Sequence, residues 1–215
     1  MRSSRTVVPA LVLCLTAASG AFAQNASRAV HFGVLGGAAF DKPGGADASN
    51  INGTYTGWIV GAFAALHLSP SFAIQPELSY VHKGAKIVET GTTGTLRLPY
   101  VGVPVLLKFG IPAKGSSILS PHVYAGPAVG FRTGCKARVS DGTTTVTRNC
   151  DEGTDPTEVK RTDFSLTFGG GVDVGRAIID LRYDLGLTRI DGSTENNDIK
   201  HRTFYLLAGW SFRAP

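Results

Sequence analysis

The stretch FSLTFGGGVDVGRAIIDLRYDL, from Phe164 to Leu185, decides the fold. Over 164–174 large apolar side chains alternate with small or polar ones, and over 177–185 apolar side chains alternate with charges of both signs. Alternation with a period of two is the signature of a β-strand. A tight turn at Gly175-Arg176 separates the two halves. The stretch therefore predicts a β-hairpin with one apolar face and one charged face.

The same alternation extends through the rest of the chain. Further strands are expected over residues 30–40, 58–68, 72–86, 96–109, 122–133 and 203–213. The strand at 96–109 is apolar on both faces, and we favour the register that turns Leu107 to the apolar face and Lys108 to the other. Proline cannot donate a hydrogen bond to a neighbouring strand, so bulges or strand ends are expected where proline falls inside these ranges. Those prolines are Pro76, Pro99, Pro104 and Pro127.

The lengths of the connections alternate as well. Long polar connections are expected at 41–54, 89–95, 134–161 and 191–201, whereas the second and sixth strands end in connections of about three residues. Outer-membrane barrels place short turns at the periplasmic end and long loops outside, and strands of about ten residues cross a bilayer when tilted. The 215 residues contain 27 glycines and one methionine, a composition that favours strands and turns over helices. The sequence predicts an all-β protein, an eight-stranded antiparallel up-and-down transmembrane β-barrel formed by residues 24–215.

The size of the barrel indicates which face points outward. Eight strands leave an interior only wide enough for side chains to fill it. Bulky side chains therefore belong outside, and aromatic residues near strand ends are expected to form membrane-interface belts. The residues predicted to face the membrane are Trp58, Tyr80, Phe109, Phe131, Phe164, Phe204, Trp210 and Phe212. The alternative, with the faces exchanged, is a soluble periplasmic barrel of the lipocalin kind that carries an apolar ligand.

Charged side chains on the opposite face are expected to form a network in the lumen. Its predicted members are Glu77, Lys108, Arg132, Asp163, Asp173, Asp180, Arg182 and Asp184. Charges in a narrow interior must pair or stay hydrated, because an unpaired buried charge is very costly. A salt-bridged plug is the favoured interpretation, and a small-solute pore is the alternative.

The N-terminus predicts export. Residues 1–23 carry Arg2 and Arg5, then an apolar segment, then a small-residue site that predicts cleavage between Ala23 and Gln24. Two cysteines then stay in the exported protein, and in an oxidising compartment Cys135 and Cys150 are expected to form a disulfide that stiffens the longest loop. Removing the two leader arginines lowers the formal net charge from +5 to +3, too small and scattered a charge to favour nucleic acid as a partner.

No catalytic motif stands out. Enzymes of the outer membrane use histidine with serine or an acid near the outer rim, and the candidates here are His67, His82, His122, His201, Ser79, Glu77 and Asp163. His82, near the outer end with Ser79 and Glu77 close in sequence, is the strongest of these for a lipid-modifying enzyme. The histidines show no metal-ligand spacing, and Gly169-Gly170-Gly171 lacks the lysine and helix of a phosphate loop. We expect no enzymatic activity, no metal and no cofactor.

Six stretches resemble the bacterial outer-membrane β-barrel domains known as the porin family or PorT-like barrels, of the OmpA or OmpX type. They are PELSYVHKGAK at 76–86, LPYVGVPVLLKFG at 98–110, YAGPAVGF at 124–131, FGGGVDVG at 168–175, LRYDLGLT at 181–188 and RTFYLLAGWSF at 202–212. The resemblance implies an eight-stranded barrel inserted into the bacterial outer membrane by the barrel-assembly machinery, and it brings no catalytic residues. Such barrels commonly end on an aromatic residue, whereas here Phe212 is followed by Arg213-Ala214-Pro215. The expected partners are outer-membrane lipid and an unknown extracellular ligand of the loops, and the expected state is a monomer.

Overall fold

The computed structural model describes residues 30–46, 48, 51–111, 118–150, 160–190 and 198–213. Its ten strands are β1 (Val30–Asp41), β2 (Tyr55–His67), β3 (Phe72–Glu89), β4 (Thr92–Gly110), β5 (Leu119–Arg132), β6 (Lys136–Ser140), β7 (Thr145–Asn149), β8 (Thr162–Val174), β9 (Ala177–Gly186) and β10 (Arg202–Arg213). Within these ranges, no helix has the length and apolarity to cross a membrane. The predicted signal peptide and its cleavage site at Ala23 and Gln24 lie outside the described residues.

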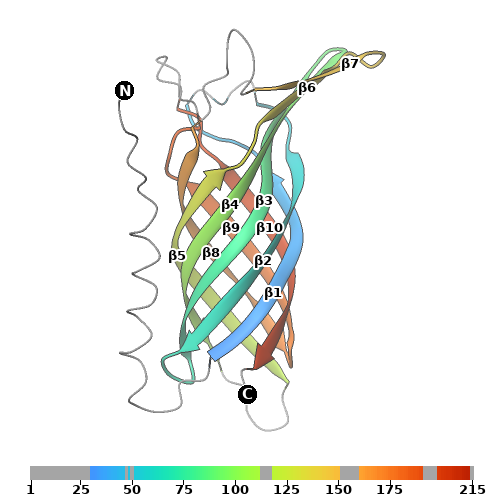
Figure 1. Cartoon of the computed structure of the whole chain (residues 1–215). Coiled ribbons are helices and arrows are strands. Elements are labelled where there is room, and N and C mark those ends of the chain that lie inside the picture. The colour runs from blue at the N-terminus through green and yellow to red at the C-terminus, as the bar shows by residue number, and fades with distance from the viewer. Residues whose placement is uncertain are drawn as a thin grey trace, which may run out of the picture.

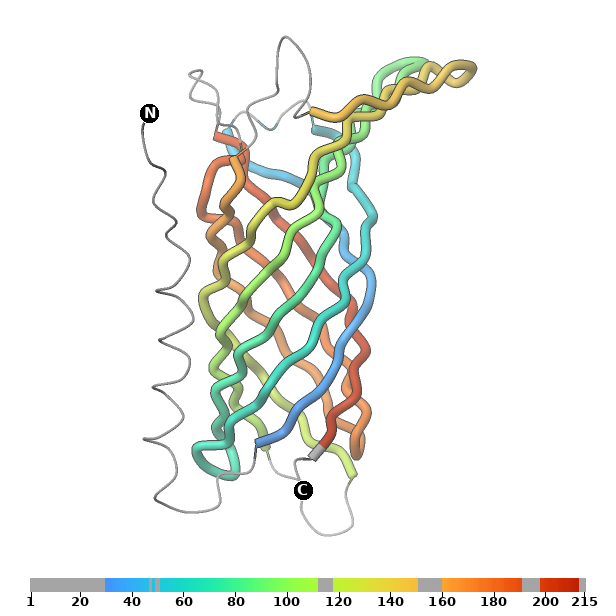
Figure 2. Tube along the Cα trace, viewed as in Figure 1, coloured from blue at the N-terminus to red at the C-terminus, as the bar shows by residue number. Residues whose placement is uncertain are grey.

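Eight of the ten strands close into a barrel, as the sequence predicts. The hydrogen-bonded order runs β3-β2-β1-β10-β9-β8-β5-β4, and β4 also pairs with β3, which closes the ring. Figures 1 and 2 show these strands tilted around one axis. β1 begins and β10 ends beside the tight turns that follow β2 and β8, with His31 opposite Arg213. In barrels of this kind that end faces the periplasm, and we call the opposite end the outer end.

Residues 134–161, expected as a loop, instead contain a hairpin. β6 pairs with β7. β6 also pairs with residues 93–97 of β4, in the part of that strand that extends past β5. The prediction of an irregular loop is wrong because polar residues can also form strands in water: Thr and Val favour strands, and Asp141-Gly142 favours a turn. Likewise, β3 and β4 extend to a turn at Thr90-Gly91, where a loop over 89–95 was expected. We call the outer ends of β3 and β4 with β6 and β7 the outer sheet (residues 83–89, 92–97, 136–140 and 145–149).

Burial follows the predicted alternation around the barrel. On β4, Leu106 is fully buried whereas Leu107 is 63% exposed, which confirms the favoured register of this strand. On β2, Phe63 points inward and Trp58 and Val60 point outward. A soluble barrel around an apolar ligand would require the opposite arrangement. The apolar face therefore forms the outer wall, and the polar face lines the lumen.

The prolines do not produce the expected bulges or strand ends. Pro76, Pro99, Pro104 and Pro127 all lie inside strands, and the register on both sides of each one is unchanged. The pairing is interrupted for two residues beside Pro76, Pro104 and Pro127, and it then resumes in the same register. In an antiparallel sheet each residue directs its N–H to one neighbour only, so a proline removes a single hydrogen bond and leaves its carbonyl available. Thr133, for example, donates its N–H to the Pro99 carbonyl at 2.8 Å.

Candidate functional site

Inward-pointing side chains, many of them polar or charged, occupy most of the lumen, because every second residue of each strand points inward. Glycines on the same face make room for the larger groups. A side chain at Gly169 would collide with the Tyr124 ring and hydroxyl, and one at Gly171 would collide with the Asp180 carboxylate. Apart from a cavity at its periplasmic end, the lumen is therefore packed, and its polar groups fall into four levels along the axis.

At the middle level, an ion pair crosses the barrel. The Arg182 guanidinium on β9 donates two hydrogen bonds of 2.8 Å to the carboxylate of Glu77 on β3, which lies on the opposite side of the ring. Arg182 also donates to the Tyr124 hydroxyl at 3.2 Å, and Gln75 donates to Glu77 at 2.8 Å. Both charged side chains are almost completely buried. A bidentate, fully buried pair is among the strongest arrangements that these two groups can form.

Nearer the periplasmic end, His122 lies between two carboxylates. Its Nε2 is 2.8 Å from Asp180 Oδ1, and its Nδ1 is 3.4 Å from Asp173 Oδ2. The Lys108 ammonium approaches the same Asp173 carboxylate at 3.2 Å. This level thus links β4, β5, β8 and β9 through alternating charges.

In the outer half, Lys83 bridges two carboxylates. Its ammonium lies 3.5 Å from Asp163 and 3.6 Å from Asp184. The hydroxyls of Tyr205 and Thr167 both donate to Asp184, at 2.8 Å and 2.6 Å. Two carboxylates thus share one cation, and the two hydroxyls satisfy both oxygens of Asp184.

At the outer mouth, Asp41 accepts several hydrogen bonds at once. His201 Nδ1 lies 2.6 Å from Asp41, the Thr203 hydroxyl donates at 3.1 Å, and the backbone N–H of Gly84 donates at 2.9 Å. The Tyr100 hydroxyl lies 3.4 Å from His201 Nε2. Asp41 and Thr203 are completely buried. This level ties β1, β3, β4 and β10 together.

Seven of the eight residues predicted for the lumen lie in the first three of these levels. Arg132 lies at the outer end of β5, opposite Tyr100 in the register. Sequence reasoning missed the fourth level, including Asp41, which was assigned to a loop, and His201, which was assigned to the connection before the last strand. Lys83, expected on the polar face of its strand, is a member of the network that the prediction lacks. Continuing the alternation by one or two residues past each predicted strand end would have found Asp41.

The histidine expected to favour an enzyme lies on the other side of the wall. His82 points outward and stacks on Trp58, with ring centroids 4.6 Å apart, whereas Ser79 and Glu77 are buried in the lumen. The Ser79 hydroxyl donates to the Gly102 carbonyl at 3.4 Å. His67 lies beside His31 at the periplasmic end, at a centroid distance of 4.5 Å. The candidate residues therefore do not form one site. Among the described residues, no group of three or more His, Cys, Asp or Glu side chains has an arrangement that could hold a metal ion.

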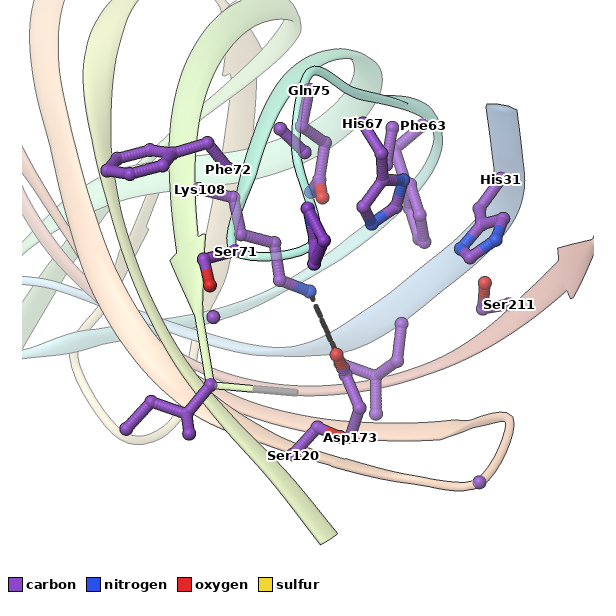
Figure 3. Close-up of a pocket in the computed structure, with 17 residues that line it drawn as sticks. His31, Phe63, His67, Ser71, Phe72, Gln75, Lys108, Ser120, Asp173 and Ser211 are labelled. Carbon is purple, nitrogen blue, oxygen red and sulfur yellow. Dashed lines mark hydrogen bonds and ion pairs between the residues drawn. The ribbon is translucent and has the colours of Figure 1, made fainter. Parts of the chain in front are cut away.

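A cavity of about 430 Å³ occupies the periplasmic end of the lumen. Figure 3 shows it between His31 and His67 on one side and the Lys108–Asp173 ion pair on the other. Gln75 also lines it, and the buried Oε1 atom of Gln75 has no hydrogen-bond partner. Residues of the short turns, such as Ser71 and Gly175, form its rim. The cavity is a vestibule that ends at the charged levels above it.

The cysteines form a disulfide at the base of the hairpin, which confirms the predicted pairing. Cys135 precedes β6 and Cys150 follows β7, with Cα atoms 5.3 Å apart. Both are buried, and the Cys150 N–H donates to the Cys135 carbonyl at 3.3 Å. The bond therefore holds the two strands together where the outer sheet leaves the barrel.

The aromatic residues predicted to face the membrane all lie on the outward face of their strands. Trp58, Phe109, Phe131, Phe164, Phe204, Trp210 and Phe212 are exposed, and Tyr80 is partly covered by Trp58 and His82. Near the periplasmic end, Phe109 packs against Phe72 with centroids 5.0 Å apart. Bulky groups at both ends of an apolar wall are typical of the two aromatic belts of an outer-membrane barrel.

Comparison with known proteins places these features in a family. The family model described as outer membrane protein beta-barrel domain matches residues 22–192. No curated protein sequence matches the chain at a significant level.

Several solved structures are similar to it. The attachment invasion locus protein Ail of Yersinia pestis, in complex with the heparin analogue sucrose octasulfate, has 16% identity and a TM-score of 0.44, with 86% of this chain and 100% of that chain covered. Neisserial surface protein A has 16% identity and a TM-score of 0.46, with 85% and 97% covered. The outer membrane protein OprG from Pseudomonas aeruginosa has 12% identity and a TM-score of 0.45, with 87% and 98% covered.

Proposed function

The chain belongs to the outer membrane protein beta-barrel domain family, and from that premise we propose that it is a closed barrel that holds a rigid sheet at the bacterial surface for contact with an external partner. The barrel lies in the outer membrane, surrounded by lipid. We further propose that the barrel-assembly machinery inserts it after signal-peptide cleavage, that it acts as a monomer, and that it is not an enzyme.

The packing of the lumen favours a closed barrel and argues against a pore. The Glu77–Arg182 pair crosses the ring, and both side chains are almost completely buried. A pocket at the level of Lys83 and Asp163 has a volume of only about 30 Å³, room for a few water molecules at most. A continuous water column would require these pairs to separate, and each separated buried charge costs several kcal/mol.

The observation that carries the surface role is the outer sheet. Figure 1 shows β6 and β7 projecting past the barrel and away from its axis. The pairing places Ile87, Val139 and Val146 on the face continuous with the lumen side, where they are 37%, 50% and 48% exposed. Exposed apolar side chains gathered on a polar extension, outside the membrane, mark a protein interaction surface. The disulfide at the base limits the freedom of this surface before it binds, which lowers the entropic cost of binding.

Cell attachment tests the surface role. Cells that express the wild type, the variant I87S/V139S/V146S or the control variant T93S/T147S would be compared on mucin-coated glass and on cells that lack the protein. We expect the wild type and the control, altered on the opposite face of the sheet, to attach several-fold more than the triple variant. As a control, the amount of folded barrel in the outer membrane, measured by its heat-modifiable mobility, must be equal in the three strains. Equal attachment by the triple variant would contradict the proposal.

Conductance tests the closed lumen separately. In planar bilayers we expect no discrete, reproducible channel events from the wild-type barrel. Such events would favour the small-solute pore, the alternative function of this fold, and would leave the role of the outer sheet to be judged by attachment alone.

A further inference from the structure

A groove on the outer wall of the barrel, near its outer end, combines aromatic and cationic side chains that play no part in the proposed surface role. It encloses about 1100 Å³ and opens broadly to the surroundings. Strands β1, β9 and β10 and the segment after β1 form it. Its lining includes Phe40, Lys42, Gly44, Tyr183, Arg202 and Phe204.

The lower part of the groove is a row of aromatic rings. Phe40, Phe204 and Tyr183 are direct cross-strand neighbours on β1, β10 and β9, and all three point outward. The Phe40 and Phe204 rings lie 6.4 Å apart, and Phe168 on β8 continues the row at 5.3 Å from Tyr183. A row of this kind at the outer end of the wall lies where acyl chains meet headgroups.

The upper part of the groove carries two cations. Lys42 and Arg202 each follow the aromatic row by two residues toward the outer end, and the Lys42 N–H donates to the Arg202 carbonyl at 3.1 Å. The Arg202 side chain lies against Gly44, where a Cβ atom would come within 2.7 Å of Nε. Glycine at this position therefore allows the guanidinium to lie across the groove.

The acids nearest in sequence are engaged elsewhere. Asp41 is fully buried on the lumen side with His201. Asp198 lies 3.0 Å from Lys200 and 3.6 Å from Arg189. In the part of the chain that the structure describes, no carboxylate forms an ion pair with Lys42 or Arg202. Among the described residues, the groove thus presents two positive charges without an ion-pair partner, next to an apolar floor.

We propose that this groove binds the phosphate group of a lipid in the outer leaflet. The acyl chains would cover the aromatic row, and Lys42 and Arg202 would bind the phosphate, Arg202 through its planar pair of N–H donors. A single Lys or Arg at the membrane interface is explained by its long side chain, which reaches from the apolar wall to the polar headgroups. It does not explain two cations that line one groove beside one aromatic row, one of them packed against a glycine.

Native mass spectrometry of the purified full-length barrel in a mild detergent tests this inference. The probes are lipid A with two phosphates, the same lipid without phosphates, and inorganic phosphate. We expect the wild type to retain the phosphorylated lipid, at least tenfold more of it than K42Q/R202Q does, and severalfold more than R202Q does. The control R148Q/R176Q removes the same charge from the outer hairpin and the periplasmic turn, and it should retain the lipid like the wild type.

Three outcomes would overturn the inference. They are equal retention by the wild type and K42Q/R202Q, equal retention of the lipid without phosphates, and loss of the bound lipid in millimolar inorganic phosphate, which would indicate a site for the free anion. Heat-modifiable mobility of each variant shows that the barrel is folded. Since attachment through Val139 and Val146 does not involve these cations, failure of either proposal leaves the other standing.

Discussion

The lumen and the outer sheet are built from the same alternating strands, but they handle polar groups in opposite ways. In the lumen, Arg182 finds Glu77 across the barrel at 2.8 Å, and Lys83 lies between two acids. In the outer sheet, polar side chains can be solvated by water on both faces. Even the apolar side chains of Val139 and Val146 are about half exposed there. Closure makes the difference, because a ring of eight strands brings distant side chains into contact, whereas a projecting sheet leaves both faces open.

The largest effect is expected where a charge loses its partner in the lumen. Glu77→Ala leaves the Arg182 guanidinium buried without a carboxylate, at a cost of about 3–5 kcal/mol. Reversible urea unfolding in lipid vesicles, followed by heat-modifiable mobility, would measure it. The control E77M/R182M removes both charges and should cost much less, because no charge is left unpaired. A similar loss for the two variants would show that shape, and not charge pairing, stabilises this level.

A cation on the membrane side of the wall should have the next largest effect. Leu206 lies near the middle of β10 and is 49% exposed on the outer face. Leu206→Arg should destabilise the barrel by about 2–4 kcal/mol, the cost of a cation near the bilayer midplane. The same unfolding measurement applies, and Val139→Arg in the outer sheet is the matched control, expected within about 0.5 kcal/mol of the wild type. Equal costs at both positions would mean that Leu206 does not face lipid.

Removing the disulfide should act on one region only. In C135S/C150S we expect the outer sheet to lose up to about 3 kcal/mol of local stability, the scale for a loop of about 15 residues. Protease cleavage within 136–149 should become faster, while the heat-dependent mobility of the barrel stays unchanged. A barrel that unfolds more readily would show that the two regions are coupled through the base of the hairpin.

The smallest expected effect concerns the hairpin tip. Hydrogen bonds from the backbone N–H groups of Thr144 and Thr143 lower the pKa of Asp141. Because the pKa of Asp141 is lower in the folded protein than in the unfolded chain, the ionised carboxylate stabilises the hairpin tip. This stabilisation is present above the ordinary pKa of aspartate and is lost as the pH falls through the lowered value. The protection of the Thr143 and Thr144 amides, meaning the slowing of their exchange relative to the intrinsic rate at the same pH, should therefore fall on acidification. Asp141→Asn should abolish this pH dependence, and its persistence in the variant would assign it to another group.

Much of the barrel was predictable because its signal is local. Alternation over 164–185 identifies two strands and their faces, and the alternating connection lengths indicate the up-and-down order. The narrow lumen of eight strands then explains why Trp58 points out and Glu77 points in. Strand ends were predicted less well, since a polar strand outside the membrane, such as β7, alternates between two faces that both meet water.

Partners within the lumen could not be predicted in this way. Asp41 and His201 lie 160 positions apart in the chain and 2.6 Å apart in space. Nothing in the local pattern pairs Glu77 with Arg182 in preference to Lys83 or Lys108. The same holds for His82, which is close to Ser79 in sequence but lies on the other side of the wall, because residues three apart on a strand point to opposite faces.

The sequence by itself determined the class of the protein, the number of barrel strands, the face that meets lipid and the cysteine pair, because each depends on short-range periodicity or on residue count. Only the tertiary structure decided which charges pair, how the prolines are accommodated, that an outer sheet continues the wall, and that Lys42 and Arg202 line one groove beside one aromatic row. Those features depend on strand register and ring closure, which bring together residues that no local pattern relates.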